Sequence, residues 1–492
     1  MTNSTEASHF DVVIIGAGIS GINAAHELIT KHPGKSFVIL DALSNFGGTW
    51  LTHTYPGVRS DTELYTLGYS YKPWKGAPYA GGAEIHSYLG EVIAEHGIGK
   101  HIRYNQRVES LNWDTASKKW TVDGINKETK EQFSLSAEFI WSCHGYYRQE
   151  KGYTPTWPGM KAFEGEIIHP QSWPENTNFK DKHVVVIGSG ATAATLVPAI
   201  ANDCGHVTVL QRSPAYFFQS PNKDDLADQL RTDGVGDEEV HATVREKAIL
   251  EMQGLTNFIA ENAEISRNGM IQMVTSQLPE GFDIAKHFTP RYLPSEQRVA
   301  RILDGDFFKV ISSGQVSMVT DEISTFTSSG VVTNDGTVID ADVVITATGF
   351  ELSVLGDIAM SIDDVPIDVA ERITHRGVMF SGVPNYAWSF GALRLSWTTR
   401  IEVISDYISR MLTFMDNRGS KVVTPTLRPE DQGMELLPFG DPKFSPGYVQ
   451  RARGSQPRSG DREPWMMNID YWDERESLPK IGFEDGTLVF EN

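Results

Sequence analysis

Two glycine-rich loops constrain the fold of this chain more than any other feature of its sequence: GAGISG at residues 16–21 and GSGATA at residues 188–193. Each loop follows a short apolar run that is typical of a buried parallel strand, and each precedes a helix-like segment. The first unit is predicted as strand 11–15, helix 19–32 and strand 36–40, and the second as strand 184–187, helix 191–203 and strand 207–210. Two such strand–helix–strand units predict an α/β fold with two Rossmann-like dinucleotide-binding domains.

The first loop has the features of a pyrophosphate site. Gly16, Gly18 and Gly21 let the backbone approach phosphate groups closely, at a helix N-terminus whose N–H groups have no partner within the helix. Asp41 stands about 20 residues beyond the last glycine, at the end of the second strand, where a carboxylate can accept hydrogen bonds from a ribose. Because an acid at this position disfavours a 2′-phosphate, the first site is predicted to bind FAD.

The second loop keeps Gly188 and Gly190, while Ala193 replaces the third glycine, a replacement that the dinucleotide fingerprint tolerates. Arg212 occupies the position that corresponds to the acid of the first site. A guanidinium can bind a 2′-phosphate through two parallel hydrogen bonds, so NADPH is favoured over NADH. A surface arginine that happens to follow a strand is the structural alternative. Together, an FAD site and an NADPH site imply hydride transfer to a flavin.

The length of 492 residues exceeds the roughly 250–300 residues at which single hydrophobic cores stop growing, so several packed units are expected. The segments RVESLNWD and KWTVDG predict a small antiparallel sheet, and FIWSCHGYY predicts a strand that returns to the first site. Residues 222–277 are polar and helix-like, and residues 338–350 form another predicted buried strand. The predicted division is an FAD-binding domain at 1–148 and 376–492, an NADPH-binding domain at 149–215 and 302–375, and a helical insertion at 216–301.

The composition restricts the kinds of partner molecule and the cellular location that are expected for this chain. The formal charge of −21 at pH 7 disfavours a nucleic acid, although a locally basic pocket can still bind a nucleotide. The only two cysteines, Cys143 and Cys204, are too far apart in the sequence for a C-x-x-C pair, so neither a redox-active dithiol nor a disulfide framework is expected. No metal site is predicted. MTNSTEASHF lacks a basic start followed by an apolar run, and no segment approaches the ~18 apolar residues of a membrane span, so a cytoplasmic protein is expected.

Two longer motifs lie around these loops. FEGEIIHPQSWP has the spacing F-x-G-x-x-x-H-x-x-x-W, formed by Phe163, Gly165, His169 and Trp173. GGTWLTHTYPGVRSD begins after Phe46 and contains Gly48, Thr49, Trp50, Tyr55, Pro56, Gly57 and Asp61. Taken with the two glycine loops, these motifs resemble the class B flavoprotein monooxygenases, and both are similar to fingerprints of the Baeyer–Villiger branch.

The resemblance runs through essentially the whole chain. Trp173 is informative because the related N- and S-oxygenating flavin monooxygenases usually carry a different aromatic residue at that position. Within the branch, YPGVRSDTELYTLGYSYKPW, KHFTPRYLPSEQR and FSPGYVQR are most similar to the mycobacterial monooxygenases that activate thioamide prodrugs.

The resemblance implies an FAD- and NADPH-dependent reaction. NADPH would reduce FAD, the reduced flavin would activate O₂, and one oxygen atom would be inserted next to a ketone carbonyl to give an ester or lactone. Sulfides and thioamides are further expected substrates. The resemblance also implies that Gly48, Thr49 and Trp50 contact the flavin, and that His169 and Trp173 link the two nucleotide domains, with packing in the core as the alternative for each.

The catalytic arginine of the family is best matched by Arg298, with Asp61 as the carboxylate that orients it. Such a guanidinium would stabilise the anionic species that form when activated oxygen attacks a ketone. Arg291 and Arg301 are rival positions. Many family members carry a lysine directly before this arginine that helps to hold the 2′-phosphate, whereas this chain has Gln297, so Arg212 would carry more of that role.

Three alternatives stay open at this point. An N- or S-oxygenating flavin monooxygenase would share both nucleotide sites but would not oxidise ketones. A non-catalytic redox sensor would bind FAD and NADPH without consuming O₂. A pyridine-nucleotide disulfide reductase has the same two-loop plan, but the missing cysteine pair argues against it. The physiological substrate and the oligomeric state are not predicted, and Tyr65, Tyr69, Tyr71 and Trp74 are expected in the core rather than in contact with substrate.

Overall fold

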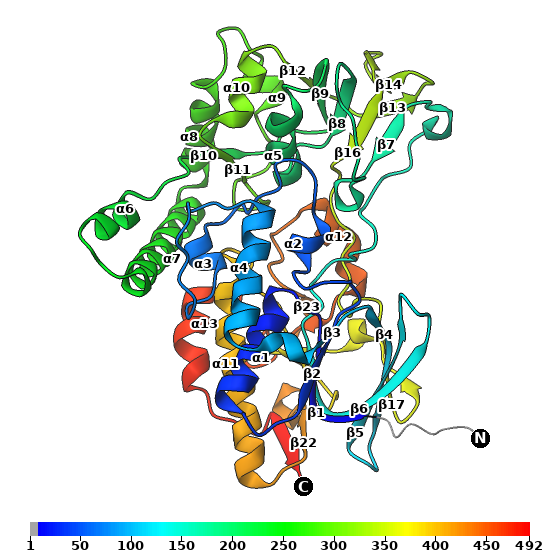
Figure 1. Cartoon of the computed structure of the whole chain (residues 1–492), viewed down its shortest axis with the longest axis vertical. Coiled ribbons are helices and arrows are strands. Elements are labelled where there is room, and N and C mark those ends of the chain that lie inside the picture. The colour runs from blue at the N-terminus through cyan, green and yellow to red at the C-terminus, as the bar shows by residue number, and fades with distance from the viewer. Residues whose placement is uncertain (1–7) are drawn as a thin grey trace.

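The larger of the two main sheets forms the core of the lower half of the molecule in Figure 1. The computed structural model describes residues 8–492. In this sheet β1 runs parallel to β2 and β6, and β4, β5 and β6 form an antiparallel meander. Its strands are β1 (Ser8–Ile15), β2 (Phe37–Leu40), β3 (Ile102–Arg103), β4 (Gln106–Asp114), β5 (Lys119–Asn126), β6 (Gln132–Ser142), β17 (Ala359–Ile362), β18 (Val365–Pro366) and β21 (Tyr386–Trp388).

Helices cover one face of this sheet, and the meander lies on the other. Because alternate residues of β1 point to opposite sides, the strand contributes to a core on each face. Val12 and Ile14 pack with α1 (Ile19–Lys31), α4 (Gly82–Glu95) and α11 (Trp397–Arg418). Val13 and Ile15 pack on the other side with the meander. The long helix α11 lies against α1, although the two are far apart in the sequence, as Figure 1 shows.

The second sheet is fully parallel and lies in the upper half of the molecule (Figure 1). Its strands are, in spatial order, β12 (Val316–Thr320), β9 (His206–Gln211), β8 (His183–Ile187), β16 (Val343–Thr346) and β7 (Glu166–Ile168). Val184 and Val186 pack beneath α5 (Ala191–Ile200) and α10 (Asp306–Ser312). Val185 packs on the opposite side, towards the small sheet β13 (Ile323–Phe326), β14 (Gly330–Thr333) and β15 (Val338–Asp340). Helices on one face and a small sheet on the other therefore bury both faces.

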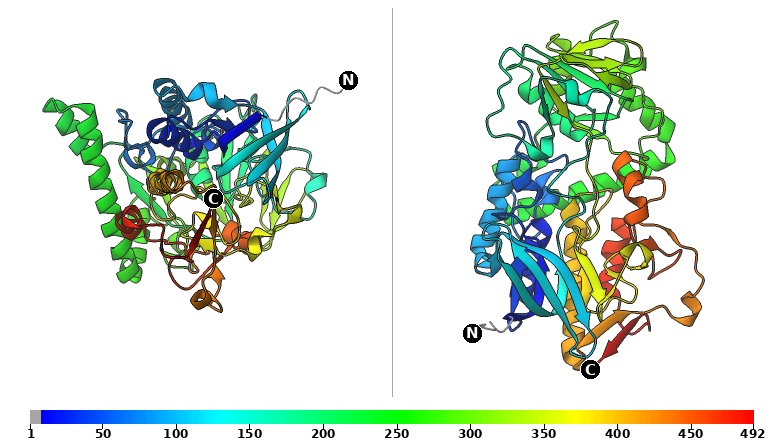
Figure 2. Two further views of the ribbon diagram at one scale, coloured as in Figure 1. Left: turned by 90° about the horizontal axis from the view of Figure 1, so that it is seen from below. Right: turned by 90° about the vertical axis from the view of Figure 1, so that its right-hand side faces the viewer.

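The segment between β9 and β12 contains the expected helices. They are α6 (Asp225–Thr232), α7 (Asp237–Glu261), α8 (Ala263–Thr275) and α9 (Ile284–His287), framed by the parallel pair β10 (Phe217–Ser220) and β11 (Ala300–Leu303). The left view of Figure 2 shows α7 extending along one side of the molecule. Arg245 on α7 donates hydrogen bonds to the Tyr65 and Gly68 carbonyls at 2.8 and 2.7 Å and to Glu402 of α11 at 2.6 Å. These bonds attach the insertion to the lower half.

The remaining elements are short. The helices are α2 (Thr49–Thr52), α3 (Leu64–Leu67), α12 (Gly447–Ala452) and α13 (Tyr471–Ser477), and the strand pairs are β19 (Thr374–His375) with β20 (Met379–Phe380), β22 (Val422–Pro425) with β25 (Leu488–Glu491), and β23 (Leu437–Pro438) with β24 (Arg458–Ser459). The aromatic residues expected in the core are there: Tyr65, Tyr69 and Trp74 are buried, and Tyr71 packs against the same cluster.

Both predicted strand–helix–strand units are confirmed, and so is the two-site α/β fold. The prediction of one buried strand over 338–350 is wrong, because β15 and β16 belong to different sheets. The chain turns at Ala341, whose N–H donates to the carbonyl of Ser329, just before β14 of the small sheet. The Asp342 carboxylate accepts a hydrogen bond from the N–H of His183 in β8, which belongs to the five-stranded parallel sheet. The helix predicted to reach residue 203 ends at Ile200.

The domain division stays a proposal, with one adjustment. Strand β17, inside the range 302–375, pairs with β4 of the first sheet. We therefore propose that the chain returns to the first domain near residue 350. Residues 1–7, on which part of the expectation about the N-terminus rests, lie outside the described residues. Within residues 8–492, no helix combines the length and the apolar character needed to cross a membrane.

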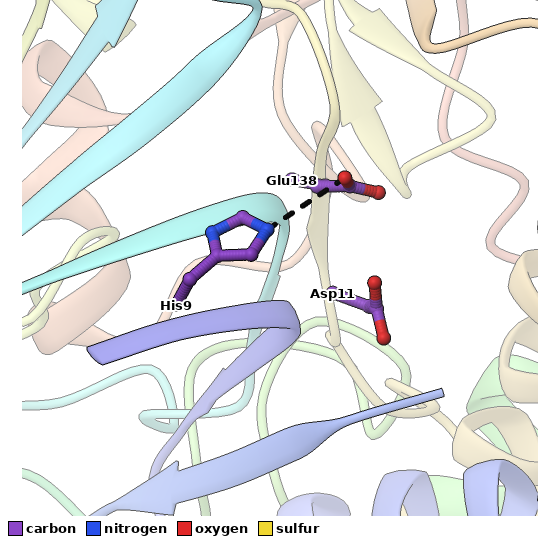
Figure 3. Close-up of side chains that lie close together, drawn as sticks. All are labelled: His9, Asp11 and Glu138. Atoms are coloured by element: carbon purple, nitrogen blue, oxygen red, sulfur yellow. Dashed lines mark ion pairs between the residues drawn. The ribbon is translucent and has the colours of Figure 1, made fainter. Parts of the chain in front are cut away.

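A surface cluster of three side chains lies on β1 and β6 of the first sheet (Figure 3). His9, Asp11 and Glu138 bring potential metal-ligand atoms within 4.8 Å of one another. The Asp11 carboxylate already accepts hydrogen bonds from the N–H and hydroxyl groups of Ser36, and His9 forms a 3.7 Å ion pair with Glu138. These contacts account for the cluster as a surface hydrogen-bond and ion-pair network that joins β1, β6 and Ser36.

Candidate cofactor and active site

A cavity of about 1270 Å³ lies between the two halves of the molecule. The carboxyl ends of β1, β2 and β6 border it from one side, and those of β8 and β9 border it from the other. Parallel sheets bind their ligands at this edge, where the strands end and the helices begin. Both glycine loops open into this one cavity.

At two glycines of the first loop the backbone is packed too closely for a side chain. Gly16 has φ +101°, and a Cβ atom there would lie 2.6 Å from the Cys143 carbonyl oxygen. A Cβ at Gly21 would lie 1.8 Å from the Gly16 carbonyl oxygen. Gly18 is the N-cap of α1 and has no side-chain cap, so the first N–H groups of the helix face the cavity. These unpaired donors suit an anion.

The second loop repeats this geometry. Gly188 has φ +120°, and its Cβ would lie 2.3 Å from the Ala347 carbonyl oxygen. Gly190 is the uncapped N-cap of α5, with open space around it, and Ala193 faces the buried side of the helix. Arg212 follows β9, lines the cavity and is exposed to it. Within residues 8–492 its guanidinium has no carboxylate at ion-pair distance, so it is free to bind an added anion.

Asp41 lies at the end of β2 and is buried at the cavity wall. Its two oxygens accept hydrogen bonds from the N–H groups of Ala17 at 2.6 Å and Leu43 at 2.7 Å. Burial raises its pKa, while these two hydrogen bonds oppose the shift. Because each carboxylate oxygen can accept a second bond, Asp41 keeps capacity for a ribose hydroxyl while it supports the first glycine loop.

The residues of the GGTW motif meet the first glycine loop. A Cβ at Gly48, where φ is +54°, would lie 3.2 Å from the Gly18 Cα atom. Thr49 Oγ1 lies 2.7 Å from the Tyr147 hydroxyl, and Trp50 packs at the edge of the core. All three motif residues line the cavity.

The two long motifs touch each other where the halves of the molecule meet. The rings of Tyr55 and Trp173 lie 6.5 Å apart, and the Tyr55 hydroxyl is 3.4 Å from Thr195 on α5. Gly57 has φ +77°, and its Cβ would lie 2.3 Å from the Thr195 carbonyl oxygen. The YPG turn of the lower half therefore rests directly on the helix of the second glycine loop.

Within the described residues, none of Phe163, Gly165, His169 and Trp173 lines the cavity. Phe163 packs in the core beside the small sheet, and a Cβ at Gly165 would meet the Phe163 ring at 2.5 Å. His169 Nδ1 accepts a hydrogen bond from the Gln171 N–H at 3.1 Å, and burial lowers its pKa. The four residues therefore organise the connection between the halves rather than contact a ligand in the cavity.

The His169 ring fills the space above Gly152, whose Cβ would lie 1.8 Å from Cε1 of the ring. We expect Gly152→Ala to displace His169 and to slow the NADPH-dependent reduction of the flavin as much as His169→Ala does. Stopped-flow reduction under anaerobic conditions measures this rate. Gly34→Ala, at a glycine that does not line the cavity and has nothing within 4 Å of its Cβ position, is the control for a general effect of a glycine-to-alanine change. A wild-type rate in Gly152→Ala would contradict the structural role of the contact.

Arg298 lies just before β11, with its side chain exposed to the cavity. Among residues 8–492 no carboxylate lies within 4.0 Å of its guanidinium. Asp61 lines the same cavity, but its carbonyl oxygen accepts a hydrogen bond from Arg301 Nε at 3.2 Å. Arg301 also lies over the Tyr79 ring at 5.0 Å, whereas Arg291 does not line the cavity. Arg298 and Arg301 both line the cavity without an ion pair among residues 8–492, but Arg301 already donates to the Asp61 carbonyl and the Ser220 hydroxyl. Arg298 is therefore the candidate whose guanidinium is available to a ligand in the cavity.

A smaller cavity of about 60 Å³ adjoins Arg298. It shares Arg298, Tyr146 and Tyr448 with the main cavity, and its walls include the aromatic residues Trp388, Phe390, Phe439 and Phe444. An apolar chamber beside an unpaired guanidinium suits a molecule with an apolar body and one polar acceptor.

Comparison with known proteins places the chain in a family. A sequence profile described as pyridine nucleotide-disulphide oxidoreductase matches residues 10–261. The FAD-containing monooxygenase EthA of Mycolicibacterium smegmatis is 42% identical over 94% of this chain and 93% of its own length. The probable FAD-binding monooxygenase AlmA of Acinetobacter baylyi is 40% identical over 98% of this chain and 96% of its own length. The chain belongs to the family of FAD-containing monooxygenases.

A solved structure has the same fold as this monooxygenase. Cyclohexanone monooxygenase from Rhodococcus sp. Phi1, bound to NADP⁺, superposes with a TM-score of 0.76 over 99% of this chain and 100% of its own, at 21% identity. The description of the profile includes disulfide oxidoreductases, but the two cysteines of this chain do not form the redox-active pair that such a reaction needs. Cys143 and Cys204 are both free, and burial raises the pKa of each thiol to about 12. This FAD-containing monooxygenase therefore has no reactive dithiol among its described residues.

Sequence reasoning missed several residues of the cavity in this monooxygenase. Tyr146 and Tyr147 follow β6, where the apolar run indicated only a strand, and Phe350 follows the Ala-Thr-Gly turn after β16. Tyr448 and Arg451 come from α12, more than a hundred residues beyond Arg298. Only the aromatic character of FIWSCHGYY and FSPGYVQR could have pointed to the three tyrosines, and no signal marked Phe350.

Proposed function

We propose that this monooxygenase uses FAD and NADPH to insert one oxygen atom of O₂ next to a ketone carbonyl, giving an ester or lactone. The observation that carries the proposal is the unpaired guanidinium of Arg298 in a cavity that both glycine loops enter. The names of the relatives support FAD, and the NADP⁺ of the solved cyclohexanone monooxygenase supports the second nucleotide. The complete Baeyer–Villiger fingerprint supports the ketone.

The residues around the cavity fit both nucleotides. The uncapped N-termini of α1 and α5 would hold the two pyrophosphates, Asp41 the FAD ribose, and Arg212 the 2′-phosphate. When bound, NADPH supplies a hydride and FAD passes the electrons to O₂. Thr49 and Trp50 would border the flavin, whereas His169 and Trp173 would hold the two halves in register.

Arg298 would bind the carbonyl oxygen of the substrate and stabilise the negative charge that develops on it as the new carbon–oxygen bond forms. A permanently charged guanidinium does this without a proton transfer of its own. Asp61 lines the same cavity as Arg298 and would orient it once the cavity is filled. The adjoining aromatic chamber would receive the apolar part of the substrate. Sulfides and thioamides, which need an electrophilic oxygen, are proposed as further substrates.

An N- or S-oxygenating monooxygenase without ketone activity is the second candidate, because it needs the same two nucleotide sites. Trp173, which contacts Tyr55 at the junction, favours the ketone-oxidising branch. A cytoplasmic location stays a prediction from the sequence.

The direct test is product analysis under ¹⁸O₂. The FAD-loaded protein is incubated with NADPH and a set of cyclic ketones, alkyl aryl sulfides and tertiary amines, and the products are identified by mass spectrometry. Ester or lactone that carries one ¹⁸O atom supports the proposal. Labelled sulfoxide or N-oxide with no ester from any ketone supports the second candidate. Oxygen consumption that yields only hydrogen peroxide with every substrate would contradict both.

Arg212→Ala tests the 2′-phosphate site. We expect the KM for NADPH to rise roughly ten- to a hundredfold, the loss expected for a charge-assisted hydrogen bond, while the KM for NADH changes little. Steady-state kinetics with both nucleotides measures the effect. Lys309→Ala on α10 removes an exposed cation that does not line the cavity and serves as the control. Equal increases for NADPH and NADH would count against the assignment.

A further inference from the structure

His53 is a buried histidine in the wall of the main cavity, and none of the roles proposed above uses it. It follows α2 directly. In the sequence it lies between Thr49 and Trp50, which are proposed to border the flavin, and Tyr55, whose hydroxyl is 3.4 Å from Thr195 on α5 of the second nucleotide site. His53 is therefore a cavity residue of the segment that runs from one nucleotide site to the other.

Three aromatic rings hold the imidazole of His53 in one orientation. The rings of Tyr55, Tyr147 and Phe350 meet it edge to face, with centroid distances of 6.2, 5.9 and 5.8 Å. Tyr147 and Phe350 also stack on each other at 4.6 Å, and the Tyr147 hydroxyl lies 2.7 Å from Thr49 Oγ1. Tyr147 follows β6 of the first sheet and Phe350 follows β16 of the second, so both halves of the molecule contribute to this packing.

The two ring nitrogens of His53 have different surroundings. Nδ1 lies 3.1 Å from the Thr49 carbonyl oxygen, and because a carbonyl can only accept, Nδ1 carries the hydrogen. The Thr52 hydroxyl, also 3.1 Å from Nδ1, can accept this hydrogen too, since its own hydrogen has the Gly48 carbonyl at 3.3 Å. Nε2 has no hydrogen-bond partner among residues 8–492 and is not enclosed by protein atoms. It is therefore an acceptor that is open to the cavity.

An acceptor at this place suits an N–H donor and does not suit a phosphate oxygen. Burial lowers the pKa of His53, although the hydrogen bond to Thr49 opposes the shift, so the ring is neutral at neutral pH. Both nucleotides contain an amide-type donor, the carboxamide of nicotinamide and the N3–H of the flavin. The contacts of His53 with Phe350 and with Tyr55, which reaches α5, favour the nucleotide of the second site.

We propose that Nε2 of His53 accepts a hydrogen bond from the carboxamide N–H of the NADPH nicotinamide and so orients this ring for hydride transfer. The inference rests on the NADPH requirement of the proposed function and deepens it, but it does not depend on which substrate is oxygenated. A ring held on three sides is a preorganised acceptor, which fixes the nicotinamide without a rearrangement of the protein.

Two amide variants of the FAD-loaded full-length protein test the role of Nε2. In His53→Asn the side chain keeps a donor near the Nδ1 position but has no acceptor at the Nε2 position, whereas in His53→Gln the longer side chain can place its amide oxygen there. We expect anaerobic flavin reduction at saturating NADPH to slow roughly ten- to a hundredfold in His53→Asn, since a misplacement of about 1 Å at reacting atoms has an effect of up to that size. His53→Gln should recover most of the wild-type rate. Equal rates in wild type and His53→Asn would overturn the inference.

His101→Asn is the matched control. Nδ1 of His101 lies 3.3 Å from the Phe37 carbonyl oxygen and its ring stacks on Phe37 at 4.0 Å, but His101 lines neither cavity. This variant should be reduced at the wild-type rate.

The 3-acetylpyridine analogue of NADPH separates the nicotinamide from the flavin, because a methyl ketone without an N–H donor replaces its carboxamide. With this analogue, wild type and His53→Asn should be reduced at equal rates. Equal losses with NADPH and with the analogue would overturn the inference and leave His53 as a flavin contact or a packing residue.

Binding at equilibrium gives a readout without turnover. The Kd of NADP⁺, measured by the change in flavin absorbance, should rise up to about tenfold in His53→Asn, the effect of one net hydrogen bond. The Kd of the oxidised acetylpyridine analogue should stay unchanged, and an equal rise for both would overturn the inference. If NADPH does not reduce wild type at all, the proposed function fails, and the two dissociation constants alone decide the role of His53.

Discussion

Arg298→Ala is expected to lower ester formation by about 10²- to 10³-fold while NADPH still reduces the bound flavin at the wild-type rate. The size of the loss is that of removing one preorganised donor from the position where negative charge develops. Reduction should be unaffected because the glycine loops and Arg212, not Arg298, provide the contacts proposed for the two nucleotides. Ester yield by mass spectrometry and anaerobic stopped-flow reduction separate the two half-reactions.

Two further arginine variants make this result specific. Arg291→Ala removes a nearby exposed arginine that does not line the cavity and should retain wild-type ester formation. Arg301→Ala should lower stability instead, because Arg301 binds the Asp61 carbonyl and the Ser220 hydroxyl. Wild-type ester yield from Arg298→Ala would remove Arg298 from the proposed mechanism.

Gly57→Ala is expected to slow NADPH-dependent flavin reduction at least tenfold. The new Cβ would lie 2.3 Å from the Thr195 carbonyl oxygen, and neither backbone can move without separating the YPG turn from α5. Because hydride transfer depends on the placement of two nucleotides held by different halves, a shift of about 1 Å at this contact is enough for such a loss. Anaerobic stopped-flow with NADPH measures the rate, and reduction by dithionite, which needs no nucleotide, should be unchanged.

Gly97→Ala is the matched control. Gly97 has φ +63°, close to the +77° of Gly57, but has nothing within 4 Å of its Cβ position. It should therefore show only the conformational cost of a left-handed alanine, about 1–2 kcal/mol of unfolding free energy, and a wild-type reduction rate. Equal behaviour of the two variants would mean that the contact between the halves has no part in the transfer.

Local periodicity was sufficient to predict the parts of the fold that depend on near neighbours in the sequence. The strands around both glycine loops and the meander have apolar or alternating patterns, and the structure confirms them. The insertion was predicted as helical from its polar, charged sequence, and its helices are confirmed as well. The need for glycine at positions 16, 21 and 188 was predictable because the backbone approaches another backbone closely there.

The 22-residue helix α11 was not predicted, although Ile401, Ile404 and Ile408 recur at helical spacing, and part of its buried face is polar. Ser405 accepts a hydrogen bond from Asn23 at 3.0 Å, and Arg400 forms a buried ion pair with Glu474 at 2.7 Å. These partners come from distant parts of the chain, so polar residues that look solvent-exposed in the sequence are satisfied only after folding.

The same limit applies to the site. Arg298 and Asp61 were chosen by resemblance, and the sequence could not indicate that the carbonyl of Asp61 would be bound by Arg301. Tyr448, which lines the cavity together with Arg298, is 150 positions away in the sequence and reaches it only because the C-terminal segment returns to the cavity.

Neighbouring strands of the first sheet come from distant parts of the chain. This affects the order in which the sheet can fold while the protein is being synthesised. Strand β6 ends at Ser142, but its neighbour β21 begins at Tyr386, and α11, which covers α1, follows β21. About 240 residues separate the two strands, which is roughly 10–50 s of translation at the usual rates. During that interval the strands of the parallel second sheet emerge and can fold as a unit, while apolar surface on β6 and α1 stays uncovered. Nascent chains of this monooxygenase therefore have a long window in which chaperone binding competes with aggregation, and flavin can be captured stably only near the end of synthesis.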